Sequence, residues 1–257
     1  MKVGLALSGG GARGFAHVGV LKALIDNGIR LDLVAGTSAG AIVGAALAAG
    51  MSIDEIYAMS RRIGWLNFLR PSLSPRGLAS NVPLGNFLRH ELPVDRIEDL
   101  KMPYAAVVYD LTAGHEVVYK DSGDLIFAIR SSCAVPGVFE PVIDTNGHLM
   151  VDGGVTTVLP TRVARDLGAD VVIAVDVISS GEQFRTVPWN AMAMSIRSAM
   201  VLLRQTAKVQ QQLADVVVIP QIAHIRPDQI NKREELLKLG EEAGQAAIED
   251  IKKLISV

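Results

Sequence analysis

Apolar runs and helical periodicities alternate along this chain. Residues 2–8 are mostly apolar and predict a buried strand, and residues 15–28 carry apolar side chains at helical spacing up to an Asn-Gly stop. Residues 33–35 predict a second buried strand, and the Ala-rich residues 41–49 predict a helix directly after it. This alternation of strands and helices is typical of an α/β fold.

The remainder of the chain continues the alternation. Further strands are predicted over residues 104–109, 116–119, 169–175 and 215–219. Further helices are predicted over residues 52–63, 84–92, 125–132, 190–213 and 232–255. The last two strands are apolar runs typical of buried parallel strands. We therefore predict one domain over residues 1–257, an α/β fold with a mostly parallel central sheet and helices on both faces. Loops are expected over the Pro/Ser/Gly-rich residues 71–81 and, as the most mobile one, over residues 179–188.

Ser38 stands at the centre of Gly36-Thr37-Ser38-Ala39-Gly40, between a predicted strand and a predicted helix. A G-x-S-x-G sequence in that context predicts a nucleophile elbow, a sharp turn that exposes the serine hydroxyl at the top of a sheet. Gly36 and Gly40 leave room for the turn. The N-terminus of the following helix favours developing negative charge. The alternative interpretation is a glycine-rich packing turn.

Residues 9–14, Gly-Gly-Gly-Ala-Arg-Gly, follow the first predicted strand. Consecutive glycines present backbone N–H groups without obstruction by Cβ atoms, so the loop is suited to hold an anion. Two kinds of site use such a loop, namely a nucleotide phosphate site and an oxyanion hole for acyl transfer.

The sequence disfavours the phosphate site, although Gly9, Gly11 and Gly14 match the pattern G-x-G-x-x-G. A dinucleotide-binding fold requires an acidic residue at the end of the next strand, whereas Asp32 precedes that strand. Phe15 occupies the position of the lysine in a Walker-type loop. The oxyanion hole is therefore the favoured interpretation.

A third motif, Val151-Asp152-Gly153-Gly154, places a carboxylate at the end of an apolar run. The two glycines would allow the carboxylate to approach another site closely. Asp-Gly is also a common pair in ordinary turns, so this motif alone does not establish a functional site.

The three motifs, in this order, resemble the patatin-like phospholipase family. The family pattern is an oxyanion loop G-G-G-x-R/K-G, a nucleophile motif G-x-S-x-G and a carboxylate motif D-G-G/A, which match residues 9–14, 36–40 and 152–154. Residues 131–141 are similar to the stretch that precedes the aspartate in this family. The resemblance spans residues 3–160. It implies a patatin-like three-layer sandwich, in which residues 161–257 complete the same domain.

The resemblance also implies the chemistry and the roles of individual residues. It implies a serine acyl hydrolase that cleaves fatty-acyl esters, with phospholipids or lysophospholipids as the expected substrates and with no metal or organic cofactor. Ser38 would be the nucleophile and Asp152 its general base. The implied oxyanion loop consists of Gly9, Gly10, Gly11, Arg13 and Gly14. The glycines expected beside the two catalytic residues are Gly36, Gly40, Gly153 and Gly154.

The positions of the histidines are consistent with a Ser-Asp dyad. An α/β-hydrolase triad runs in the order Ser, acid, His, and only His224 follows Asp152. We expect all five histidines to be structural or exposed, with His224 as the reserve candidate for a base. An ordinary aspartate has a pKa of about 3.9, too low for an effective base toward a serine hydroxyl. We therefore predict that Asp152 is partly buried and lies within hydrogen-bonding reach of Ser38. Burial is expected to raise the pKa of Asp152, and neighbouring N–H donors are expected to lower it again.

Composition and charge restrict the other classes of function. The chain has 257 residues, 49% of them hydrophobic, and a net charge of -2, so nothing indicates nucleic acid as a partner. Cys133 is the only cysteine, so an internal disulfide is excluded and a reducing compartment fits. We expect Cys133 to be a small core residue. The spacing of histidines, cysteine and carboxylates indicates no metal site.

Residues 33–53 contain no charged side chain and could be mistaken for a membrane span. The predicted elbow lies within them, so a buried strand, turn and helix explain the run better. No signal-peptide pattern is found at the N-terminus, and we expect a cytoplasmic protein, peripheral to the membrane at most.

Transient contact with an anionic lipid surface is a further expectation. Around residues 64–81, apolar and basic side chains lie together, as suits such a surface: Trp65, Leu66, Phe68 and Leu69 beside Arg61, Arg62, Arg70 and Arg76. Packing of a helix end on the core is the alternative, and the one that we favour. Met192, Met194 and Met200 are expected to be adaptable core residues, or to line an acyl-chain pocket. An acyltransferase, and a lipid-binding protein with low turnover, stay open as alternatives to the hydrolase. The sequence leaves the oligomeric state undetermined.

Overall fold

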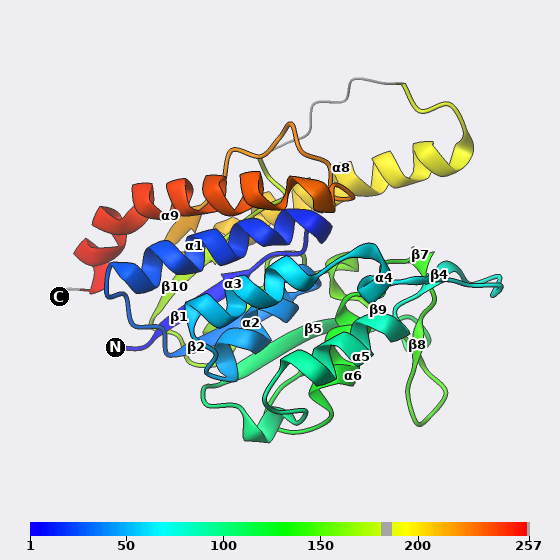
Figure 1. The fold of residues 1–257 in the computed structure, drawn as a ribbon, viewed down its shortest axis with the longest axis horizontal. Coiled ribbons are helices and arrows are strands. Elements are labelled where there is room, and N and C mark those ends of the chain that lie inside the picture. The colour runs from blue at the N-terminus through cyan, green and yellow to red at the C-terminus, as the bar shows by residue number, and fades with distance from the viewer. Residues whose placement is uncertain (181–186, 256–257) are drawn as a thin grey trace.

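A computed structural model describes residues 1–180 and 187–255 of the chain (Figure 1). Within these residues the central sheet has eight strands in the order β11-β10-β1-β2-β5-β9-β8, with β6 paired to β5. The parallel part of the sheet consists of β1 (Val3–Leu7), β2 (Leu33–Thr37), β5 (Tyr104–Asp110), β10 (Val171–Val175) and β11 (Val216–Val218). Antiparallel pairing adds β6 (His115–Tyr119), β9 (Leu149–Asp152) and β8 (Val142–Ile143).

Helices cover both faces of this sheet, because successive strand residues point to opposite faces and both sets are apolar. On β1, Leu5 and Leu7 pack in the larger core, beneath the helices α1 (Phe15–Asp26), α2 (Ala39–Ala48), α3 (Ile53–Arg62), α5 (Val82–Glu91), α6 (Leu125–Ser132) and α9 (Arg233–Ile255). Ala6 faces the opposite, Ala-rich core, which is covered by α7 (Thr161–Asp166). The long helix α8 (Ala191–Gln211) packs beside α7. The chain therefore folds as a three-layer α/β sandwich with a mostly parallel sheet, as predicted.

The predicted strands and helices are confirmed, with boundaries that shift by a few residues. The charge-free run over residues 33–53 contains β2, the turn at Ser38 and α2. No helix within residues 1–180 and 187–255 combines the length and the hydrophobicity that a transmembrane span needs. Most of the predicted mobile loop, residues 181–186, lies outside the described residues.

The prediction of a simple loop over residues 71–81 is wrong. The region from residue 65 onwards contains α4 (Trp65–Phe68), β3 (Arg70–Pro71) and β4 (Gly77–Ser80). β4 pairs with β7 (Gly137–Phe139), and β3, β4 and β7 form a separate three-stranded sheet. These strands are two to four residues long, and β4 pairs with the distant β7. A local pattern of hydrophobicity does not show such pairing.

Candidate active site

Ser38 lies in the sharp turn that joins β2 to α2. Its φ of 54° and ψ of −121° are unusual for a residue with a side chain, and Asp121 is the only other non-glycine residue with positive φ in the described chain. A Cβ atom added to Gly36 would overlap the carbonyl of Gly40, and one added to Gly40 would overlap the carbonyl of Leu7. The turn is thus possible only because both flanking positions are glycine. The predicted strand–turn–helix context of Ser38 is confirmed.

A buried side chain from α6 holds this strained turn in place. The backbone N–H of Ser38 donates a hydrogen bond to Ser132 Oγ at 2.8 Å, and the Ser132 hydroxyl donates in turn to the carbonyl of Val107 at 2.7 Å. Ser132 is completely buried, so both hydrogen bonds are shielded from water. Sequence reasoning assigned no role to Ser132, and its place in the family-like stretch 131–141 was the only available signal.

The sheet brings Asp152 to the same level as Ser38. β2 and β9 pair end to end with one edge of β5, because β6 occupies the other edge along residues 106–110: Thr37 lies opposite Val107, and Asp152 lies opposite Val108. Ser38 follows Thr37 directly, so both side chains flank the same part of the central strand β5. Ser38 is 7% exposed and Asp152 is 6% exposed.

The environment of Asp152 changes its acidity. Burial raises the pKa of the carboxyl from its ordinary value of 3.8 to about 6, while hydrogen bonding with the hydroxyl of Ser38 and with the N–H of Gly154 lowers it in part. Asp152 Oδ1 accepts the Gly154 hydrogen bond at 2.7 Å. The expected burial of Asp152, its proximity to Ser38 and the opposing effects on its pKa are all found in the structure.

Cys133 is a second neighbour that the sequence did not place at this site. It is buried, as expected for a small core residue. Burial and the charge of Asp152 raise the pKa of the thiol well above its ordinary value, and a hydrogen bond with Ser38 offsets this only in part. The thiol is therefore neutral, and a neutral thiol is a poor nucleophile.

The glycine loop that follows β1 lies against Ser38. A Cβ atom added to Gly9 would stand 3.4 Å from Ser38 Cβ. The N–H of Gly9 donates to the carbonyl of Val158 at 2.9 Å, so it is already used. For Gly10 and Gly11, no residue in the described part of the chain accepts a hydrogen bond from the backbone N–H. Gly14 packs directly on Ala39, at the start of α2.

Arg13 has a different position from that of an anion ligand. Its side chain is completely buried, with Nε donating to the carbonyl of Ile225 at 2.7 Å and Nη1 to the carbonyl of Val177 at 3.5 Å. A buried guanidinium requires such acceptors, because an unpaired charge in the interior is costly. Arg13 thus ties the glycine loop to two later segments of the chain.

The histidines lie apart from Ser38 and Asp152. His17 Nε2 is 2.8 Å from the carbonyl of Ser8, and burial lowers the pKa of His17 to about 4. His148 pairs with Asp110, and His224 pairs with Glu235 on α9. Among the described residues no histidine hydrogen-bonds to Ser38 or Asp152.

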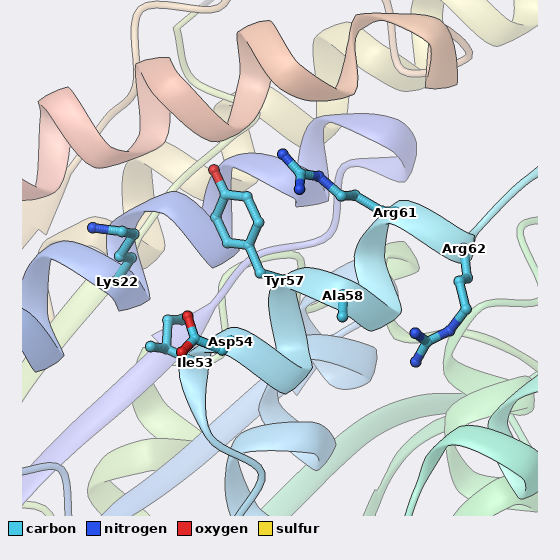
Figure 2. Close-up of a pocket in the computed structure, with 7 residues that line it drawn as sticks. All are labelled: Lys22, Ile53, Asp54, Tyr57, Ala58, Arg61 and Arg62. Carbon is cyan, nitrogen blue, oxygen red and sulfur yellow. The ribbon is translucent and has the colours of Figure 1, made fainter.

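Neither a metal site nor the pocket between α1 and α3 offers an alternative catalytic centre among the described residues. No group of His, Cys, Asp and Glu residues in the described chain is arranged to hold a metal ion. A pocket of about 590 Å³ lies between α1 and α3, with Lys22 coming from α1 and Tyr57 and Arg61 from α3 (Figure 2). Lys22 is paired with Asp26 and Glu241, and Arg61 with Glu234, so these charges are already compensated.

Comparison with known proteins identifies relatives by sequence. A family model described as patatin-like phospholipase matches residues 5–165. The chain is 34% identical over 250 residues to patatin-like phospholipase domain-containing protein 7 of Rattus norvegicus, covering 87% of this chain and 18% of that protein. An uncharacterized NTE family protein of Mycobacterium tuberculosis is 39% identical over 182 residues, covering 70% of this chain and 50% of that protein. The chain spans half or less of the length of these curated relatives.

Solved structures with low sequence identity share the fold. VipD from Legionella pneumophila superposes with a TM-score of 0.58 at 14% identity, over 97% of this chain and 67% of that chain. Human GIVD cytosolic phospholipase A2 superposes with a TM-score of 0.51 at 12% identity, over 98% of this chain and 58% of that chain. With the family model matching more than half of its residues, the chain belongs to the patatin-like phospholipase family.

Proposed function

We propose that this protein is a serine acyl hydrolase that cleaves fatty-acyl esters of phospholipid or lysophospholipid type. The observation that carries the proposal is the strained Ser38, held beside a buried Asp152 whose pKa is about 6. Membership of the family, and the phospholipase names of relatives and structural neighbours, support the lipid substrate class.

In the proposed mechanism Ser38 Oγ attacks the ester carbonyl carbon, while the ionised carboxylate of Asp152 takes the hydroxyl proton. The carbonyl oxygen becomes an oxyanion, held by the N–H groups of Gly10 and Gly11. Collapse of this intermediate breaks the ester bond, and the leaving alcohol takes the proton from Asp152. Asp152 then removes a proton from water, which attacks the acyl-Ser38 carbonyl. The fatty acid leaves, and the serine regains its proton.

Two features would supply most of the rate enhancement. A pKa near 6 brings the base closer to the operating pH than an ordinary aspartate, which improves proton transfer while the carboxyl stays ionised at neutral pH. Each oxyanion donor is worth about 2.7–4 kcal/mol of transition-state stabilisation in comparable sites. In this account Arg13 is a positioning residue, which holds the glycine loop through the carbonyls of Ile225 and Val177.

Fatty-acid release from defined substrates tests the proposed function. The purified protein would be incubated separately with phosphatidylcholine, lysophosphatidylcholine and a short-chain nitrophenyl ester, with and without an added alcohol acceptor. Release of free fatty acid without the acceptor would support a hydrolase. Product formed only by transfer to the alcohol would favour an acyltransferase instead. No turnover of any ester would contradict the proposal and favour a lipid-binding protein.

The pH dependence of hydrolysis should report the ionisation of Asp152. Because the base acts in its ionised form and its pKa is about 6, kcat/KM should be constant above pH 7 and fall as the pH drops through 6. At pH 5 we expect about a tenfold loss relative to the plateau. Initial rates with the nitrophenyl ester between pH 4.5 and 8 measure this, and a plateau that extends down to pH 4.5 would contradict a base with a pKa near 6.

Removal of the Ser132 hydroxyl should slow catalysis without unfolding the protein. Ser132→Ala leaves the N–H of Ser38 and the carbonyl of Val107 without their partner, so the nucleophile loses its fixed position. We expect kcat to fall by about 10- to 100-fold with a small change in KM. Ser131→Ala is the matched control: Ser131 is equally buried, but its hydroxyl bonds to no residue that the structure describes. Equal effects of the two substitutions would argue against a positioning role for Ser132.

A further inference from the structure

The N-terminal half of α8 extends beyond the body of the molecule (Figure 1). Ala207 is the first buried residue of this helix among those whose side chains the structure describes. Apolar side chains are nevertheless exposed over and just before this half, including Trp189 at 87%, Met194, Ile196, Val201 and Leu202 at 67%. The expectation that Met194 belongs to the core is therefore wrong. A surface helix of this kind requires a partner that accepts apolar side chains.

The charges on this segment have one sign. From residue 187 to residue 214 the chain contains no Asp or Glu, while α8 carries Arg197, Arg204 and Lys208. Solvent-exposed helices usually mix acidic and basic residues. Exposed apolar and aromatic side chains together with basic residues alone are the signature of a helix that lies in an anionic lipid interface.

A second segment repeats this pattern at the same end of the molecule. Residues 64–90 contain no Asp or Glu, and Leu66, Leu73 and Leu78 are strongly exposed, as are Arg70 and Arg76. The hairpin formed by β3 and β4 projects toward the same end of the long axis as the start of α8 (Figure 1). Of the apolar side chains that the sequence singled out here, Leu66 is exposed, whereas Phe68 and Leu69 pack on the core as the alternative interpretation expected. Helix α8 adds a second exposed element that sequence reasoning did not connect with this segment.

Both segments adjoin the candidate active site. Met200 and Leu203 on the inner side of α8 pack with Val158, whose carbonyl accepts the N–H of Gly9. Leu203 also lies close to Gly154, which donates to Asp152. The second segment reaches the site through β4, which pairs with β7. Strand β7 begins four residues after Cys133, which contacts Ser38.

We propose that residues 66–78 and 187–202, here called the acid-free face, dock on an anionic phospholipid bilayer. The apolar side chains enter the headgroup region and the basic residues meet the lipid phosphates. The role of docking rests on the proposed function, because it would bring the ester bond of a membrane lipid to Ser38. A second copy of this chain suits the face poorly, since two like copies would place basic surfaces against each other.

Vesicle flotation tests the docking surface independently of turnover. The full chain carrying Ser38→Ala is used, because this variant cannot degrade the vesicles. It would be floated with phosphatidylcholine vesicles, with and without about 30 mol% of the anionic lipid phosphatidylglycerol, to which basic residues are attracted. The test variant is Ile196→Glu with Leu202→Glu, which places two carboxylates on the face. The control variant is Leu254→Glu, which makes the same kind of substitution outside the face. Leu254 is 40% exposed and lies near the C-terminal end of α9, which is at the opposite end of the molecule (Figure 1).

We expect the parent to bind anionic vesicles, with affinity that falls as salt increases, and the double variant to bind at least about tenfold more weakly. Arg76→Gln should weaken binding about fivefold, and Leu254→Glu should leave it unchanged. Binding of the double variant equal to that of the parent would overturn the proposal. The proposal would also be overturned if light scattering showed the parent to be a dimer and the double variant to be a monomer, because the face would then bind a second copy of the chain. Hydrolysis of the soluble nitrophenyl ester reports the proposed function separately, because it needs no docking.

Discussion

Replacing Ser38 with alanine is expected to reduce kcat/KM for every hydrolysed ester by about 10⁴-fold or more. The substitution removes the atom that forms the acyl-enzyme, whereas the glycine loop and the binding surface are unchanged and leave only residual catalysis. Fatty-acid release by the purified variant, at enzyme concentrations high enough to detect a rate 10⁴-fold below that of the parent, measures the loss.

A glycine variant separates the role of the hydroxyl from the strain of the turn. Ser38→Ala keeps a Cβ atom at a φ of 54°, but Ser38→Gly removes the conformational penalty of about 1–2 kcal/mol. Both variants should be inactive, and the glycine variant should unfold at a higher temperature than the alanine variant. Activity within tenfold of the parent in either variant would exclude Ser38 as the nucleophile.

Replacing Asp152 with asparagine is expected to have two opposite effects. Hydrolysis should fall by about 10³-fold, because the amide cannot accept the proton of Ser38. Stability at neutral pH should rise, since ionising a carboxyl whose pKa is raised from 3.8 to about 6 by burial costs about 3 kcal/mol of unfolding free energy. In the parent, the stability contributed by the protonated carboxyl is complete below pH 4 and is lost as the pH rises through 6. The stability gain of the variant should therefore be present at pH 7 and vanish near pH 4.

Asp110 provides the matched control for this stability change. It is also buried and lies on β5, but there the N–H groups of Thr112 and Ala113 and the side chain of His148 outweigh the effect of burial and lower its pKa. Its ionised form is thus favoured by folding, and Asp110→Asn should destabilise the protein at pH 7. Urea unfolding of the two variants at pH 7 and pH 4.5 checks the signs. A destabilised Asp152→Asn variant at pH 7 would mean that the ionised carboxylate is structurally favoured, as at Asp110.

Local patterns were sufficient to predict the framework and the three motifs. The parallel strands are continuous apolar runs, and a glycine-flanked serine between a strand and a helix has few structural alternatives, so β2, Ser38 and α2 followed from the sequence. The same holds for the burial of Asp152, which stands at the end of an apolar run.

Contacts between distant parts of the chain could not be predicted in this way. Ser132 reaches Ser38 from a helix that lies 94 positions later, and nothing in its local sequence distinguishes it from Ser131. Arg13 was expected near the oxyanion because of its place in the loop motif, but its partners Val177 and Ile225 become visible only once the chain is folded. The exposure of α8 is of the same kind, because its apolar residues are compatible with a core helix until the folded chain shows that Ile196, Leu202 and Val209, among others, are exposed.

The most direct test of the account is the reaction of the protein with a fluorophosphonate probe, followed by mass spectrometry of the labelled peptide. An activated serine attacks such a probe and retains its phosphonyl group. The account predicts one adduct, on Ser38, which forms quickly at pH 7.5, more slowly at pH 5, very slowly in Asp152→Asn and not at all in Ser38→Ala. Absence of labelling in the folded parent, or an adduct on another residue that survives Ser38→Ala, would contradict the central claim that Asp152 activates Ser38.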